Sequence, residues 1–193
     1  MSQIENLIKK HCPNGVEFKK LCEISLLKAG DRITKAIMSD DFKYPVIGGG
    51  TMPTGKFNDF NRQKCITISR AGSAGFVNWQ EDEFWATDVC FTAENLVDFM
   101  NLKFIYYFLK NLQTDLQSHL YGGSLPKLDK NYLWNFKIPV PPIEVQNEIV
   151  KILDNFTKLE AELEAELEAR RRQYYYYRDK LLSFDTHTHT HTP

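Results

Sequence analysis

Residues 50–56, GTMPTGK, contain groups that could surround a phosphate. Two glycines and a lysine at this spacing, after an apolar segment, are typical of a nucleotide-binding loop. The pattern is incomplete, because Phe57 stands where a serine or threonine would hold magnesium. Residues 58–61 are also a poor start for the helix whose amides would bind phosphate. We therefore interpret the stretch as a loop with backbone turns rather than as part of a nucleoside triphosphatase.

Patterns for other catalytic classes are incomplete as well. A DNA adenine methyltransferase needs Asn or Asp followed by Pro-Pro-Tyr, whereas residues 140–143 read Val-Pro-Pro-Ile. Residues 70–75 lack the acidic partner of a dinucleotide fingerprint and do not form the glycine-flanked serine of a nucleophile elbow. His11 and His119 stand alone, as surface or core histidines usually do. We predict no catalytic residue and no metal site in this chain.

The elements that must hold these loops are short strands and one helix. An S-x-x-E cap at Ser2 and Glu5 predicts a helix over residues 2–10. Leucine and aromatic residues at helical spacing predict another helix over residues 101–120. Apolar and β-branched runs predict strands or extended segments at residues 16–24, 44–47, 65–69, 76–79, 84–87, 89–92 and 133–140. Together these elements predict an α+β fold, in which a globular β-rich domain precedes a long coiled-coil-forming helix.

The most regular pattern follows the prolines at positions 141 and 142. Apolar residues recur at helical spacing up to Phe156, and Thr157 with Glu160 forms a capping box that predicts a fresh helix start. Acidic residues at 166 and 168 precede arginines one turn later, which favours ion pairs. Beyond the box, steps of three and four predict a coiled-coil seam that needs a partner: Leu159, Leu163, Leu167, Arg170, Tyr174, Tyr177 and Leu181.

Composition and charge limit the classes of protein to which this chain can belong. The 193 residues, 42% of them hydrophobic, predict a folded domain with an extension. No apolar run reaches membrane-spanning length and the first twenty residues lack a signal-peptide core, so we expect a cytoplasmic protein. The four cysteines lack a C-x-x-C pairing, which favours reduced thiols. Residues 28–70 hold eight bases and four acids, which fits either a phosphate-binding surface or an ordinary solvated one.

Three regions follow from these patterns. We expect a globular domain over residues 1–142 and a long helical region over residues 143–184. Residues 185–193, in which threonine and histidine alternate, are interpreted as a disordered end rather than as a metal site.

Three stretches of the sequence resemble a known family. They are CPNGVEFKKL at residues 12–21, ISRAGSAG at 68–75 with GGSLPK at 122–127, and IPVPPIEVQNEIVKIL at 138–153 with QYYYYRDKLL at 173–182. They resemble half of a DNA sequence-specificity subunit of a type I restriction-modification system. That family usually has two target-recognition domains, each followed by a helix, and the two helices pair antiparallel. This sequence has one of each, so the resemblance implies a target-recognition domain over residues 1–142 and a helical spacer and dimerisation region over residues 143–184.

The resemblance implies a non-catalytic subunit that addresses a complex to double-stranded DNA. Methylation would come from a methyltransferase subunit that uses S-adenosylmethionine, and cleavage from a restriction subunit. Two copies would pair through Leu159, Leu163, Leu167, Tyr174, Tyr177 and Leu181 and read a palindromic split site. We expect DNA contacts at Thr51, Lys56, Asn58, Arg62, Arg70, Ser73, Asn78, Tyr121, Ser124 and Lys127.

Among these residues we expect Arg70 to read guanine, because its fork matches the major-groove edge of that base. Lys56 and Lys127 are expected to contact phosphates. A different class remains open, namely a coiled-coil assembly protein whose globular head binds protein rather than DNA. Salt-dependent retention on duplex DNA, together with copurification of a methyltransferase, distinguishes the two classes.

Overall fold

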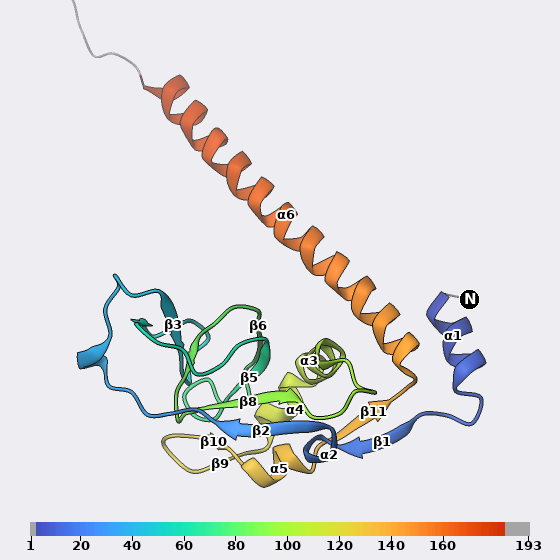
Figure 1. Cartoon of the computed structure of the whole chain (residues 1–193). Helices are drawn as coiled ribbons and strands as arrows, with labels where there is room; N and C mark the ends of the chain where they lie inside the picture. The colour runs from blue at the N-terminus through green and yellow to red at the C-terminus, as the bar shows by residue number, and fades with distance from the viewer. Residues whose placement is uncertain (1–2, 184–193) are drawn as a thin grey trace, which may run out of the picture. The chain divides into compact units, whose positions relative to one another are not determined.

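The chain was examined as a computed structural model, which describes residues 3–183 (Figure 1). The described residues form two compact units, which meet between Val150 and Lys151. The first unit is rich in β-strands, and α6 (Ile143–Leu182) continues from it as a single long helix. The predicted fold class, a β-rich globular domain followed by a long helix, is therefore confirmed.

A four-stranded antiparallel sheet lies at the centre of the first unit. Its order is β2 (Ser25–Ala29), β8 (Cys90–Asn95), β5 (Cys65–Ser69) and β6 (Val77–Gln80). All five residues of β5 are buried. Because side chains alternate along a strand, Ile66 and Ile68 point to the main core, whereas Cys65, Thr67 and Ser69 point to the other face.

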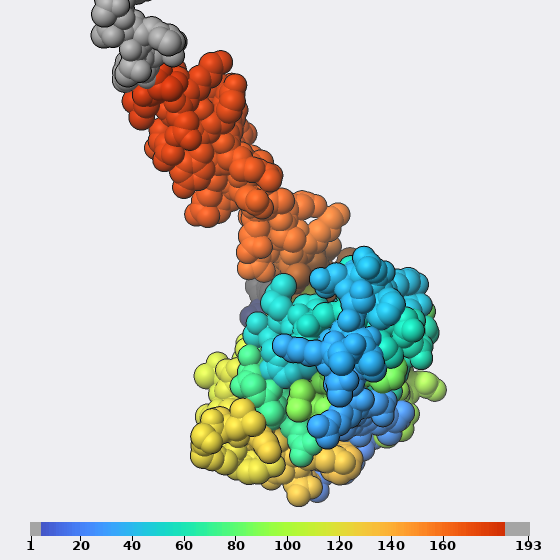
Figure 2. All heavy atoms as spheres, turned by 90° about the vertical axis from the view of Figure 1, so that its left-hand side faces the viewer, coloured from blue at the N-terminus to red at the C-terminus, as the bar shows by residue number. Residues whose placement is uncertain are grey.

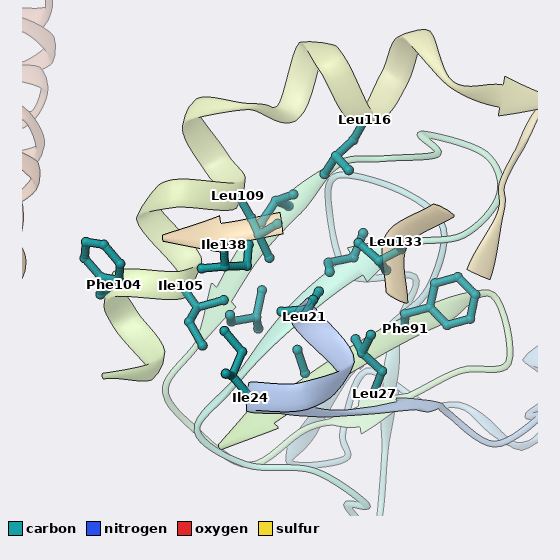
Figure 3. Packing of buried hydrophobic residues seen from close by; sticks show 14 of the residues in the cluster. Leu21, Ile24, Leu27, Phe91, Phe104, Ile105, Leu109, Leu116, Leu133 and Ile138 are labelled. Carbon is teal, nitrogen blue, oxygen red and sulfur yellow. The ribbon is translucent and has the colours of Figure 1, made fainter. Parts of the chain in front are cut away.

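The main core packs on the first of these faces. The helices that cover it are α2 (Leu21–Ile24), α3 (Leu102–Asn111), α4 (Gln113–Ser118) and α5 (Lys130–Trp134). Figure 3 shows their buried leucine and isoleucine side chains meeting those of the strands. Asn101 caps α3, since its side-chain oxygen accepts hydrogen bonds from the backbone amides of Lys103 and Phe104.

A second, smaller sheet packs near the opposite face of β5. Its order is β4 (Lys56–Phe57), β3 (Tyr44–Ile47) and β7 (Trp85–Ala86), with β3 parallel to β7. Ala86 and Phe84 form a buried cluster with Cys65 of β5, and Ile47 packs against it. Burial raises the pKa of Cys65 and of Cys90 to about 12, so both remain thiols at neutral pH. All four cysteines are free in the structure.

Two strand pairs, a helix and a helical turn complete the first unit. β1 (Glu17–Lys20) pairs with β11 (Lys137–Val140), and β9 (Leu120–Tyr121) pairs with β10 (Lys127–Leu128). The N-terminal helix is α1 (Gln3–His11), and η1 (Lys35–Ile37) is a short 3₁₀ turn. Ser2, the expected cap of α1, lies outside the described residues, as do residues 185–193 of the expected tail.

Several predicted elements were wrong in extent. The strand expected at 16–24 ends at Lys20, and Leu21 and Ile24 instead share the buried side of one helical turn. The helix expected at 101–120 breaks at Leu112, whose backbone leaves helical geometry between α3 and α4. The extended segment expected at 133–140 begins inside α5. Strand β2 was not predicted at all.

The helix start predicted at Thr157 was also wrong. The Thr157 hydroxyl donates a hydrogen bond to the carbonyl of Leu153 at 3.0 Å, and α6 runs through this position without a break. The ion pairs predicted from Glu166 to Arg170 and from Glu168 to Arg172 are present. A 40-residue helix is about 60 Å long at 1.5 Å per residue. Among the described residues, no helix combines the length and apolar character needed to cross a membrane.

A buried glutamine fixes the beginning of α6 within the first unit. Gln146 is 0% exposed, and its side-chain nitrogen donates to the carbonyls of Pro141 at 2.7 Å and Phe99 at 3.0 Å. Its side-chain oxygen accepts from the backbone amide of Asn101 at 2.8 Å. One side chain thus ties the first turn of α6 to the start of α3.

Replacing Gln146 with leucine should destabilise the first unit. The substitution leaves two carbonyls and one amide buried without partners, and each such group costs about 1–3 kcal/mol. We expect the free energy of unfolding, measured by urea denaturation, to fall by at least about 2 kcal/mol. The exposed Gln63→Leu variant is the control and should change it by less than about 0.5 kcal/mol. Equal unfolding midpoints for the two variants would show that the network does not stabilise the junction.

Candidate nucleic-acid interface

Two glycine-rich loops of the first unit hold each other in place. One follows β3 at residues 48–55 and the other follows β5 at residues 70–76. The backbone amide of Ser73 donates to the carbonyl of Gly49 at 2.7 Å. A Cβ atom on Gly49 would lie 2.0 Å from the carbonyl oxygen of Ala71, so only glycine allows this approach. The loops that carry Thr51 and Ser73 are therefore packed together.

The hairpin formed by β9 and β10 lies beside the second of these loops. The amide of Leu128 donates to the carbonyl of Arg70 at 2.8 Å, and Ala71 forms a β-bridge with Lys127. Lys127 in turn stands opposite Tyr121 in the hairpin. Ser124 is exposed in the turn that joins the two strands. Arg70, Tyr121 and Lys127, three of the residues predicted to contact DNA, are thus on adjoining backbone segments.

We call residues 48–55, 70–76 and 120–128 the three-loop surface. In Figure 2 the chain from about β2 to β4, coloured blue to cyan, forms much of the near face of the first unit, and the yellow β9–β10 region lies to one side. Tyr121 is half exposed, and the guanidinium of Arg70 lies 5.8 Å from the centre of the Phe91 ring. The surface therefore combines the exposed Tyr121 and Ser124 with an arginine and a lysine that are both partly buried.

A cavity of about 150 Å³ opens beneath the first loop. Thr51 and Asn78, both predicted site residues, line it together with Thr67, Ser69 and Gln80. The sequence analysis missed the last three. Their signal was the alternation of polar and apolar residues along residues 65–69 and 77–80, which places the polar side chains on one face.

The strand that carries Asn78 is protected at its outer edge. β6 is an edge strand of the four-stranded sheet, and its Val77 amide donates to the side chain of Gln113 at 3.0 Å. The ammonium of Lys110 donates to the carbonyl of Val77 at 2.9 Å. Burial lowers the pKa of Lys110. These contacts close the edge to further strands and hold β6 against α3.

Lys56 directly follows the first loop of the three-loop surface, and Asn58 lies two residues further along the chain. The ammonium of Lys56 donates to the carbonyl of Asp40 at 3.2 Å. Lys56 and Asp40 line, together with Lys35 and others, a shallow depression of about 230 Å³. Asn58 is exposed just after β4. Lys35 is a second ammonium near Lys56 that the sequence analysis counted in the basic region but did not assign to a site.

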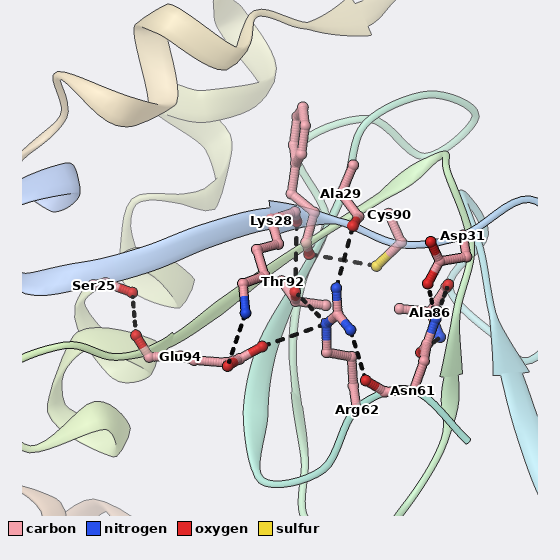
Figure 4. A network of polar contacts seen from close by, with 11 residues as sticks. Ser25, Lys28, Ala29, Asp31, Asn61, Arg62, Ala86, Cys90, Thr92 and Glu94 are labelled. Carbon is pink, nitrogen blue, oxygen red and sulfur yellow. Dashed lines mark hydrogen bonds and ion pairs between the residues drawn. The ribbon is translucent and has the colours of Figure 1, made fainter.

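Arg62 lies inside the first unit rather than on this surface. Its guanidinium donates to the carbonyls of Asn61 at 2.6 Å and Ala29 at 3.3 Å and to the hydroxyl of Thr92 at 3.1 Å. It also pairs with Glu94 at 3.3 Å, and only 15% of the side chain is exposed. Figure 4 shows these contacts converging on one side of β2 and β8. Arg62 therefore joins β2 and β8 to its own segment, and these partners within the first unit occupy its guanidinium.

Asn61 extends the same network toward the second sheet. Its side-chain nitrogen donates to Asp31 at 2.9 Å and to the carbonyl of Ala86 at 3.0 Å. Its side-chain oxygen accepts from the amide of Ala86 at 2.7 Å. Within residues 3–183, no group of three or more histidine, cysteine or acidic side chains is placed to hold a metal ion.

Comparison with known proteins identifies the family. Residues 13–169 match the profile of the type I restriction modification DNA specificity domain, and the chain belongs to this family. It is 32% identical over 152 residues to a Haemophilus influenzae protein named as a type I restriction enzyme specificity subunit. It is 30% identical over 153 residues to the type I restriction enzyme MpnII specificity subunit of Mycoplasma pneumoniae.

These relatives are much longer than the matched region. The two alignments cover 76% of this chain but 39% and 44% of those proteins. The crystal structure of a type I restriction-modification S subunit from M. genitalium superposes with a TM-score of 0.73 at 24% identity. That match covers 90% of this chain and 48% of the other, so the two share a fold over about half of the longer protein.

Removal of the Arg62 side chain should lower the stability of the first unit more than removal of an exposed side chain does. Arg62→Ala leaves Glu94 without its closest partner and removes hydrogen bonds to two carbonyls and one hydroxyl. We expect the free energy of unfolding to fall by about 1–3 kcal/mol. Arg32→Ala, at an exposed position, is the control and should leave the melting temperature nearly unchanged. A normal melting temperature for Arg62→Ala combined with weakened DNA binding would instead make Arg62 a ligand contact.

Proposed function

We propose that this chain supplies the DNA address of a type I restriction-modification complex and performs no bond-making step itself. Membership of the specificity family over residues 13–169 carries the proposal. The three-loop surface supports it, because it combines Arg70 and Lys127 with exposed hydroxyl, aromatic and glycine residues. Phosphate contacts fix a protein's register on DNA, and side chains that reach base edges give specificity.

Within this surface, Arg70 is the proposed base reader and Lys127 the proposed phosphate contact. A guanidinium can donate two parallel hydrogen bonds to the major-groove edge of guanine, whereas an ammonium acts as a compact charge. Arg70 is held by backbone hydrogen bonds on both sides, to Val89 and from Leu128. A fixed backbone favours specific reading, because little freedom is lost when the side chain binds.

The second unit supports a proposal that two copies of the chain pair. Phe156, Leu159, Leu163, Leu167, Tyr174, Tyr177 and Leu181 are all about half exposed or more along α6. Leu159, Leu163 and Leu167 share one face of α6, and Tyr174, Tyr177 and Leu181 recur at helical spacing further along it. A seam of this kind is satisfied by a second helix. With antiparallel pairing, two identical recognition domains would read a palindromic site with an unread spacer.

The remaining partners are proposed from the family and from the other faces of α6. Tyr175 and Tyr176 are also at least half exposed, and at 100° per residue they lie off the leucine seam. Aromatic side chains on several faces of the same stretch of a helix are all covered only when more than one partner packs against that stretch. We assign these tyrosines to a methyltransferase subunit, which would bring S-adenosylmethionine, and we expect a restriction subunit to join the complex.

The alternative is an assembly protein whose globular head binds protein. Chromatography on duplex DNA at rising salt, with the methyltransferase of the same system coexpressed, separates the two functions. The proposal predicts salt-dependent retention and copurification of the methyltransferase. Passage through the column at low salt by the intact, folded complex would favour the protein-binding function.

Arg70→Ala and Lys127→Ala should have different effects on DNA binding. We expect Arg70→Ala to relax specificity at one base and to cost about 1–3 kcal/mol on the preferred sequence. Lys127→Ala should weaken all sequences alike and reduce the slope of log affinity against log salt by about one. Binding to a set of single-base variants at several salt concentrations measures both. A uniform loss with a reduced salt slope for Arg70→Ala would make it a phosphate contact instead.

A charge introduced into the leucine seam should prevent pairing. Leu163→Glu places a carboxylate at the centre of the proposed helix pair, whereas Ala165→Glu places the same group on the opposite side of α6. We expect sedimentation velocity to give a dimer for the unmodified chain and Ala165→Glu and a monomer for Leu163→Glu. Dimers from all three proteins, or monomers from all three, would contradict pairing through this seam.

A further inference from the structure

The cavity beneath the first loop of the three-loop surface has a polar floor and an apolar rim. Thr67 and Ser69 project into it from the central strand β5, and Asn78 and Gln80 from the neighbouring strand β6. The rim includes Met52, whose side chain is 74% exposed, and the ring of Phe76. The cavity thus presents hydroxyls and carboxamides at depth and hydrophobic groups at its mouth.

Two of the polar groups in the cavity are available to a ligand. Ser69 is only 4% exposed, yet its hydroxyl has no hydrogen-bond partner within residues 3–183. The carboxamide of Asn78 likewise makes no hydrogen bond to the described part of the chain, although the Asn78 carbonyl accepts one from Thr67 at 3.3 Å. Both groups face the cavity and neither is held by another side chain, so a polar group that enters the cavity can form hydrogen bonds with them.

The lining also defines the chemical class of that group. No charged side chain of the described residues lines the cavity, which disfavours phosphate and carboxylate ligands. Carboxamides that both donate and accept suit the edge of a neutral base, and Asn or Gln pairs well with adenine. A volume of about 150 Å³ fits one small ring system rather than a nucleotide with its phosphate.

The depth of Thr67 and Ser69 in the cavity determines whether a base that remains stacked in a duplex can reach them. Thr67 and Ser69 are 3% and 4% exposed on the middle of the sheet, out of reach of base edges that remain stacked in a duplex. An enzyme or binding protein that reads a base in a recess must take it out of the stack. An exposed apolar side chain beside the recess, here Met52, can fill the gap left between base pairs.

We propose that this cavity receives one nucleobase, adenine in preference, extruded from the duplex bound at the three-loop surface. Asn78 and Ser69 recognise its hydrogen-bonding edge, while Met52 occupies the vacated position in the stack. The inference rests on the proposed DNA-binding function and adds to it a base-extrusion step at the recognition domain. It concerns a base other than the one that the methyltransferase modifies.

The test uses the complex of this chain with its methyltransferase, without S-adenosylmethionine. Duplexes carry the motif read from the methylated bases, with a single mismatch placed in turn at each position that is not methylated. A mismatch removes part of the free-energy cost of extruding a base. The complex should therefore bind roughly tenfold more tightly, or better, to a duplex whose mismatch lies at one particular position of each half-site. 2-Aminopurine at the same position should report an unstacked base on binding.

Asn78→Leu is the informative variant, because the Asn78 carboxamide makes no hydrogen bond that folding requires. The melting temperature of this variant should equal that of the unmodified chain. Its complex should bind the intact motif more weakly and should not bind the mismatched duplex more tightly than the intact one. The control is Gln63→Leu, at an exposed position outside the cavity; this variant should retain the tighter binding to the mismatched duplex.

Two other outcomes are distinguishable. Specific binding with no position strengthened by a mismatch would overturn base extrusion and leave the proposed DNA-addressing function intact. Loss of all sequence-specific binding by the intact complex would contradict the proposed function, and the extrusion step with it.

Discussion

The two-residue alternation along β5 is the constraint on which the first unit depends. Ile66 and Ile68 complete the main core, while Cys65, Thr67 and Ser69 are buried on the opposite face. Because residues opposite each other in antiparallel strands share a face, Thr67 stands between Thr92 of β8 and Asn78 of β6. A slip of one residue would move isoleucines into the polar layer and hydroxyls into the core. The strand register therefore creates the core and the candidate site together.

The polar layer divides into two parts with different tasks. At the β2 and β8 side, Arg62, Glu94 and Thr92 satisfy one another and join strands to the second sheet. At the β6 side, the Ser69 hydroxyl and the Asn78 carboxamide face the cavity beneath the glycine-rich loop. The same face of one sheet thus holds a closed network that stabilises and an open one that can receive a ligand. The close approach of Gly49 to Ala71 keeps the covering loop in position above the open part.

The sequence predicted those features that depend on neighbouring residues. The strands at 44–47 and 65–69 have the predicted bounds, because alternation and flanking glycines define them locally. The long helix was predicted, but the capping box at Thr157 was given too much weight, since nothing before it breaks the helix. Arg62 could not be placed from sequence, because its partners Ala29, Thr92 and Glu94 lie about thirty residues away on two strands. The β9–β10 hairpin carries too few apolar residues to signal its pairing with the loop at Arg70.

The central claim is that the chain addresses methylation to a palindromic split site. Mapping methylated bases in DNA from cells that coexpress this chain with its methyltransferase tests it most directly. The account predicts one bipartite motif whose two halves are inverted repeats separated by a fixed unread spacer. An asymmetric motif would contradict pairing of two identical copies, and an intact complex that methylates no defined motif would contradict DNA addressing itself.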